Sequence, residues 1–219
     1  MRIPDGQLSF DELNKLYSEQ ANERSMPYDQ FFGEMDLAQE QIERRKETAK
    51  RIEKFMIPAL TLMWYMRQQG IFDYVEATNE MLQPYENLLK ELGIPLTAFF
   101  ATTHTQTTVS EIVMATLEHQ DDAYFYSIDR AILVAENEAN SIWNDSEFQD
   151  AINAGRTMKE WRAILDKRTR ETHRIANGQR VPIMEPFQVG DSLLQFPRDG
   201  SLGASPEELV NCRCSVIYS

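Results

Sequence analysis

Cys212 and Cys214 are the two cysteines of this sequence, and a single residue separates them. Side chains two positions apart on a β-strand project from the same face, so both sulfur atoms could reach one metal ion while Arg213 points away. His173 could supply an imidazole nitrogen, and a Cys₂His set suits zinc. A structural site normally has four ligands, and Asp166 or a glutamate earlier in the chain could complete it. The pattern therefore predicts a structural zinc site.

Two other interpretations of the cysteine pair stay open. Buried thiols can pack as small apolar groups without a metal, and a redox role is the third interpretation. A disulfide between the two would close a very small, strained ring, so we expect no structural disulfide. The remaining histidines, His104 and His119, lie in segments without ligand spacing, which indicates surface or capping positions.

A second group of chemically active side chains surrounds His173. Arg168 and Arg170 could stabilise a phosphoryl transition state while His173 acts as general base, as in a nuclease or phosphodiesterase. Alternatively, both arginines pair with acidic residues of the helical part. The sequence contains no Gly-x-Ser-x-Gly, phosphate-binding loop, HExxH or dinucleotide fingerprint. We therefore expect no enzymatic activity, no catalytic residue and no cofactor apart from the zinc ion.

The segment that contains these residues differs from the preceding part of the chain in its net charge and in its distribution of glycine and proline. Residues 1–150 carry 12 basic and 27 acidic side chains, a net charge of −15, whereas residues 151–219 carry 10 and 8, a net charge of +2. After Gly155, glycines and prolines punctuate short apolar pieces. We predict an α+β protein with an N-terminal arm (1–33), a helical domain (34–154, mainly helical over 34–150) and a module of short helix and short antiparallel strands (155–219).

Apolar periodicity predicts the elements that position the module. The clearest helix is Ile128–Trp143, with a stripe of mostly small apolar residues suited to close packing. Residues 97–108 are ambiguous. The other expected elements are a helix over Glu34–Gln69 kinked or split at Pro58, a helix over Asp73–Leu92 interrupted at Pro84 and ended by Gly93, helical spacing over Val109–Leu117, a short helical stretch at Phe10–Tyr17, and strands at Arg180–Met184, Ser192–Phe196 and Cys212–Tyr218.

Charge and hydropathy exclude two kinds of partner. A helical part this acidic would be repelled by a phosphate backbone, so we expect no direct nucleic-acid binding by it. The most apolar stretch, Phe55–Met66, is about 12 residues long, and a bilayer requires about 20. No apolar run of signal-peptide length follows Met1. We therefore expect no membrane partner.

The module contains six motifs in a fixed order. Trp161 is followed by an Asp-x-Arg-x-Arg-x-x-His run (Asp166, Arg168, Arg170, His173), a Gly-Gln pair (Gly178), a Pro-Phe pair (Phe187), a Pro-x-Asp (Pro197) and an Asn-Cys-Arg-Cys (Cys212, Arg213, Cys214). This ordered set resembles the head morphogenesis family named after phage Mu protein F, also called minor head proteins. It covers about 60 of the 219 residues, and residues 1–120 match nothing in the family.

The resemblance implies a minor head protein of a tailed bacteriophage or prophage. It would act in head (procapsid) assembly near the portal, with portal, major capsid or scaffold proteins as partners. It would be found in the virion head, and in the host cytoplasm during assembly. Some members travel with the DNA on ejection, and others carry a toxin or transferase domain after the module. The sequence ends at Ser219, so we expect no such domain. An interaction module of prophage origin with another role is the alternative.

Overall fold

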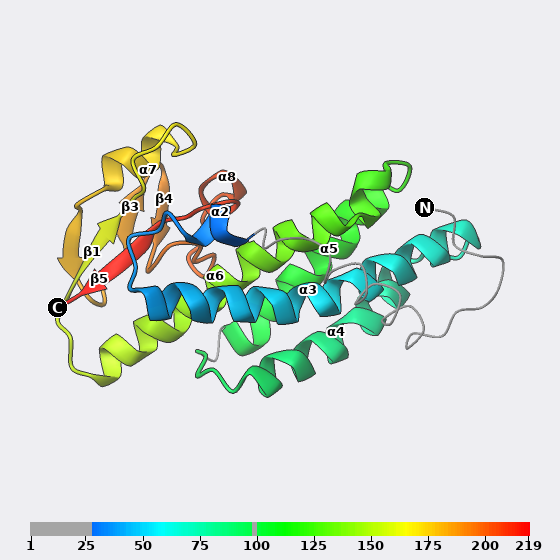
Figure 1. The fold of residues 1–219 in the computed structure, drawn as a ribbon, viewed down its shortest axis with the longest axis horizontal. Coiled ribbons are helices and arrows are strands. Elements are labelled where there is room, and N and C mark those ends of the chain that lie inside the picture. Colours follow the sequence, from blue (N-terminus) through cyan, green and yellow to red (C-terminus); the bar gives the residue numbers. More distant parts are fainter. Residues whose placement is uncertain (1–27, 98–99) are drawn as a thin grey trace.

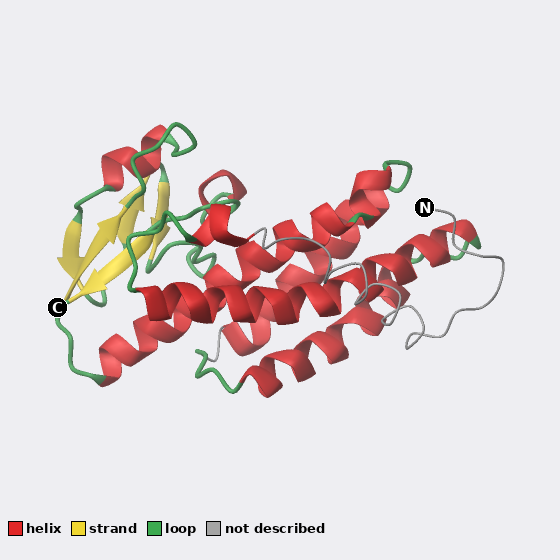
Figure 2. Cartoon of the chain, in the orientation of Figure 1, coloured by secondary structure: helices red, strands yellow, loops and turns green. Residues whose placement is uncertain are grey.

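Residues 28–97 and 100–219 are described in the computed structural model, and they form the α+β architecture that the sequence predicts (Figures 1 and 2). Helices build an elongated body, and a small mixed module, yellow to red in Figure 1, lies at one end of it. The helical stretch expected at Phe10–Tyr17 lies outside the described residues. Within the described part, no helix combines the length and the apolar character that crossing a membrane requires.

Two proline-containing helices form one side of the body. Helix α3 (Gln39–Gln68) passes through Pro58 without a break, so the expected split at this position is wrong. Helix α4 (Tyr74–Leu92) likewise continues past Pro84. Asp73 caps α4 by accepting hydrogen bonds from the first-turn backbone, and Gly93 ends it with φ +66°. The packing of α3 and α4 within the apolar core offsets the hydrogen bond that each proline removes.

Helix α6 (Ile128–Asn153) packs alongside α3 and extends ten residues beyond its predicted end at Trp143. The alanines of its predicted stripe, Ala131, Ala135 and Ala139, are fully buried and let the two helices approach closely, whereas Ile132 and Trp143 of the stripe are half-buried. The ambiguous threonine-rich segment forms a π-helical turn, η1 (Phe100–His104), that leads into α5 (Thr105–Glu118). A 3₁₀ turn, η2 (Ala123–Tyr126), then connects α5 to α6.

A short helix, α2 (Tyr28–Phe32), buries all three of its aromatic side chains in the core of the helical body. These residues fall within the stretch that the sequence assigns to an N-terminal arm. Burial of three aromatic rings provides a large apolar contact area, so residues 28–32 are structurally part of the body. The division of the chain into arm, helical domain and module stays a prediction.

The module contains two small antiparallel sheets. One has the strand order β2-β1-β5, from β1 (Met158–Arg162), β2 (Arg180–Pro182) and β5 (Ser215–Tyr218), with Trp161 opposite Val216. The other pairs β3 (Phe187–Val189) with β4 (Ser192–Leu194). The short helices α7 (Glu171–Ala176) and α8 (Pro206–Leu209) complete the module. Strands β2, β4 and β5 fall within the three predicted strands, whereas β1 and β3 were not predicted.

Candidate functional site

His173, Cys212 and Cys214 lie together in the interior of the module. His173 is on α7, and the two cysteines follow α8 and precede β5. The His173 Nδ1 atom is 3.3 Å from the Cys214 Sγ and 3.5 Å from the Cys212 Sγ. All three side chains are buried, with 1–2% of each residue exposed. The structure therefore brings together the three side chains that the sequence selects as metal ligands.

Glu208 on α8 completes this cluster, and the sequence analysis did not identify it. Its Oε2 atom lies 2.9 Å from the His173 Nε2 atom and accepts a hydrogen bond from the Thr172 hydroxyl at 2.8 Å. Gly190 makes room for this carboxylate, because a Cβ atom at that position would lie 2.7 Å from the Glu208 Oε1 atom. Glu208 follows another glutamate, Glu207, in a four-residue helix, and no sequence pattern singles it out.

The close contacts shift the pKa values of the three side chains in different directions. Burial acts to lower the pKa of His173, but Cys212 and Glu208 raise it above its usual value. Burial acts to raise the pKa of Cys212, yet hydrogen bonds from Cys214 and His173 lower it well below its usual value. Hydrogen bonding to Cys212 and burial raise the pKa of Cys214. The ionisation of either thiol therefore depends on the protonation of the other.

Aromatic rings enclose the cluster. The fully buried Trp161 of β1 meets the His173 ring edge to face, with 5.8 Å between centroids, and meets Phe187 of β3 in the same way at 5.3 Å. Both cysteines belong to the apolar core of the module together with these rings. Gly178, with φ +80°, follows the end of α7 and donates its N–H to the Trp161 carbonyl. Trp161 and Phe187 of the sequence motifs thus pack around the cluster, and Gly178 forms the turn that follows α7.

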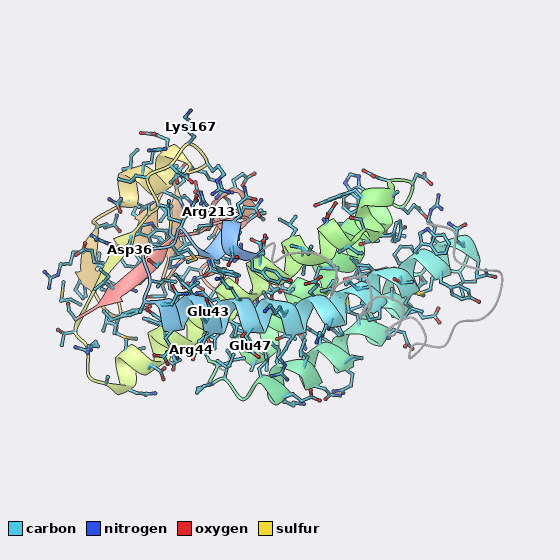
Figure 3. All side chains as sticks on the ribbon, viewed as in Figure 1. Asp36, Glu43, Arg44, Glu47, Lys167 and Arg213 are labelled. Atoms are coloured by element: carbon cyan, nitrogen blue, oxygen red, sulfur yellow. The ribbon has the colours of Figure 1, made fainter. Side chains whose placement is uncertain are left out.

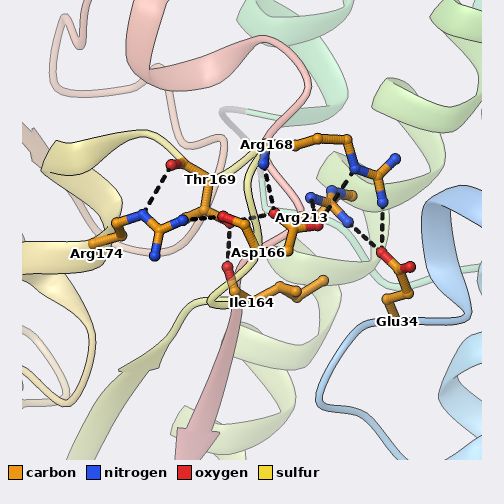
Figure 4. Close-up of polar contacts among 7 residues, drawn as sticks. All are labelled: Glu34, Ile164, Asp166, Arg168, Thr169, Arg174 and Arg213. Carbon is orange, nitrogen blue, oxygen red and sulfur yellow. Dashed lines mark hydrogen bonds and ion pairs between the residues drawn. The ribbon is translucent and has the colours of Figure 1, made fainter.

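Asp166 and three arginines form a separate polar network on the outer side of the module (Figure 4). The Asp166 carboxylate accepts hydrogen bonds from Arg213 at 2.6 Å, from the Thr169 hydroxyl at 2.9 Å and from the Arg168 N–H at 2.9 Å. Asp166 lies before α7, which begins at Glu171, and its carboxylate closes the turn that precedes this helix. Partial burial acts to raise its pKa, but these hydrogen bonds lower it well below the usual range.

The network also joins the module to the body. Glu34, in the segment between α2 and α3, pairs with Arg168 at 2.5 Å and with Arg213 at 2.8 Å. Two residues later, Asp36 pairs with Arg162 at 3.2 Å. The Asp166 carboxylate is therefore already engaged by Arg213, and among the described residues the group of side chains close enough to share a metal consists of His173 and the two cysteines.

The arrangement of Arg168, Arg170 and His173 differs from that of an open phosphoryl-transfer site. Arg168 pairs with Glu34 and Asp166, and Arg170 donates to the Val210 carbonyl. Both ring nitrogens of His173 face protein groups. The interpretation that both arginines pair with acidic residues of the helical part is correct for Arg168, which pairs with Glu34, and wrong for Arg170, which donates to a backbone carbonyl.

A polar stripe on α6 holds the other side of the module. Asn140 donates to the Cys212 carbonyl and Asn144 donates to the Pro197 carbonyl, both at 3.0 Å. Arg198, with φ +70°, donates to Asn137 and to the Ser141 hydroxyl. The stripe residues are Asn137, Asn140, Ser141 and Asn144, all buried. Their spacing of three, four and seven, visible in the sequence, indicates one helix face, but the sequence does not show that the module docks on it.

Comparison with known proteins places this site in a wider context. The chain matches the family described as Phage Mu protein F like protein over residues 105–217, more than half of its length. The match begins at Thr105 and so includes α5 and α6, beyond the segment in which sequence motifs were found. An NAD(+)--arginine ADP-ribosyltransferase, EFV of Enterococcus faecalis, is 33% identical over 95 residues, which are 42% of this chain and 19% of that protein. This chain thus spans about a fifth of that relative's length. No solved structure matches.

Proposed function

Because the chain belongs to the family of phage Mu protein F-like proteins, a family of phage head-related proteins, we propose that it is a minor head protein of a tailed bacteriophage or prophage. In this proposal the protein acts during procapsid assembly near the portal, in few copies per particle. It is made in the host cytoplasm and retained in the virion head. The observation that carries the proposal is the continuous family match from α5 to β5.

The architecture supports an assembly role. The side chains of His173, Cys212 and Cys214 are turned inward, toward protein atoms. Ion pairs fix the module to the body on one side, and the α6 asparagines fix it on the other. What the module presents outward includes exposed apolar side chains, which a protein partner can cover. The most exposed of them are Leu165, Ile175 and Met184, at 62%, 75% and 65%. A portal, scaffold or major capsid protein is the partner that we propose.

The surface of the helical body suits protein partners better than nucleic acid. Acidic side chains such as Glu43 and Glu47 lie along α3, interspersed with Arg44 (Figure 3). The net charge of residues 1–150 is −15, and such a surface repels a phosphate backbone. ADP-ribosyl transfer is not part of the proposal, because the segment shared with the Enterococcus faecalis transferase is 19% of that protein.

Deleting the gene from the phage that encodes it tests the proposal. We expect normal amounts of tail proteins, but defective heads or particles of low infectivity, and restoration by the wild-type chain supplied in trans. Normal particles of full infectivity, formed without the protein, would contradict the proposal. A separate experiment tests whether the protein enters the host with the DNA. The protein is labelled in the virion, and its location is followed after the phage adsorbs to a cell.

A further inference from the structure

We propose that His173 Nδ1 and the sulfur atoms of Cys212 and Cys214 bind one zinc ion, with a water molecule as the fourth ligand. This inference is independent of head assembly, since it concerns how the C-terminal end of the chain is held on α7. The three ligands come from two segments, one with His173 and one with both cysteines, about 40 residues apart in sequence. A metal that joins them stabilises the folded module directly, because no such site exists in the unfolded chain.

The distances between the ligand atoms agree with tetrahedral zinc. Zn–S bonds are about 2.3 Å and Zn–N bonds about 2.0–2.1 Å, so a tetrahedral angle places the nitrogen and each sulfur about 3.6 Å apart. The observed separations from His173 Nδ1 are 3.3 Å and 3.5 Å. All three ligand atoms lie within 4.8 Å of one another. Only a small adjustment of the side chains is needed to admit the ion.

The hydrogen-bonding partners of His173 favour a metal over a simple hydrogen bond. Glu208 accepts at Nε2, which places the ring proton there and leaves the Nδ1 lone pair directed at the sulfur atoms. A positively charged His173 ring would also carry a proton on Nδ1. That single proton could form a well-aligned hydrogen bond with only one of the two sulfur atoms, although both lie at nearly equal distance from Nδ1. A cation between the three atoms satisfies all of them. Metal-bound histidines usually donate their other nitrogen to a carboxylate, which is the role of Glu208 here.

The fourth position opens toward a small polar cavity. Its volume is about 20 Å³, and its lining includes the three proposed ligands together with Arg168, Arg170 and Asn211. A water molecule requires a cavity of about 10–15 Å³ with polar partners, so this space fits one water. Among the described residues, no further histidine, cysteine or carboxylate joins the group that can share the ion. Water is therefore the ligand that the geometry provides.

Metal analysis of the full-length chain, purified without a histidine tag or chelator, tests the site. We expect one zinc per chain, and cobalt(II) substitution should give the absorption of a tetrahedral thiolate-bound ion. Cys212→Ser, Cys214→Ser and His173→Ala should each lose the metal. His119→Ala, an exposed histidine outside the cluster, is the matched control and should keep it. Wild-type protein that binds neither zinc nor cobalt after reduction of its thiols would overturn the proposal.

Two further measurements keep the test decisive if a ligand variant does not fold. Glu208→Gln retains the three ligands and should weaken zinc binding about 10–100-fold. In the wild-type chain, a chelator should lower the melting temperature and expose both cysteines to a thiol reagent, and zinc but not magnesium should reverse both effects. The chain has two cysteines, so the thiol signal reports on this site alone. A melting temperature and thiol reactivity unchanged by the chelator would contradict the proposal.

Discussion

Arg213 shows how a single side chain contributes to two contacts at once. It lies between the two cysteines in sequence and is 8% exposed. Its guanidinium pairs with Asp166 within the module at 2.6 Å and with Glu34 of the body at 2.8 Å (Figure 4). The strand predicted from Cys212 begins only at Ser215, so the two cysteines precede it. Both cysteines nevertheless contact His173 in the interior, while Arg213 between them pairs with Asp166 and Glu34 instead.

Replacing Arg213 by methionine should destabilise the chain by about 2–3 kcal/mol. The substitution keeps most of the volume but removes the less exposed of the two arginines that pair with both the Asp166 and Glu34 carboxylates, and Arg168 remains as the other. The partial exposure of both acids limits the loss. Urea unfolding at neutral pH measures the effect. Lys167→Met is the matched control, because Lys167 projects into solvent (Figure 3) and the change should stay within about 0.5 kcal/mol. Equal unfolding midpoints for the two variants would refute the account of this ion-pair network.

At the scale of elements, the helices were more predictable than the strands. The period of α6 could be identified because Ala131, Ala135 and Ala139 recur on one buried face of the helix. The ends of α4 could be identified because Asp73 and Gly93 have well-defined capping preferences. Strand β1 was missed because one of its two inward residues is Lys159, whose buried ammonium donates to Gln195. A buried lysine makes an alternating strand look polar.

The candidate site was likewise predicted only in part. Cysteines two residues apart and a histidine within a recognisable motif identified the three proposed ligands. The partner of the histidine, Glu208, comes from a separate short helix, and only tertiary structure brings it to His173. Continuity of α3 through Pro58 was also decided by packing, since local propensity alone predicts a break.

The contact between α3 and α6 makes stability depend on pH. Burial, followed by the charge of Glu53 on α3, raises the pKa of Glu136 on α6 to about 7 from an ordinary value of 4.5. The folded state therefore binds a proton that the unfolded state releases between pH 4.5 and 7, and stability falls as pH rises through this window.

Glu136→Gln should remove this dependence, because glutamine resembles the protonated side chain. We expect a gain of about 1–2 kcal/mol at pH 8, after allowance for partial solvent exposure, and little change at pH 4.5. Urea unfolding at the two pH values makes the comparison. The exposed Glu118→Gln serves as control and should show no such difference. A gain from Glu136→Gln that is equal at both pH values would contradict the raised pKa.

At the scale of the whole molecule, an acidic helical body carries a nearly neutral module at one end (Figure 1). The charge difference and the ordered motifs indicated the module and its family from sequence. How the module is attached was not predicted, because it depends on Glu34, Asp36 and the α6 asparagines, which belong to other segments. This two-sided attachment joins the helical body and the module into one unit.

Quantitative mass spectrometry of purified heads, separated from tails and from free cytoplasmic protein, tests the proposed function most directly. The preparation should come from the phage that encodes the chain, with the tail fraction as control. The account predicts that the chain co-purifies with heads, in far fewer copies than the major capsid protein, and is absent from tails. A chain found in the cytoplasmic fraction but missing from both procapsids and mature heads would contradict it.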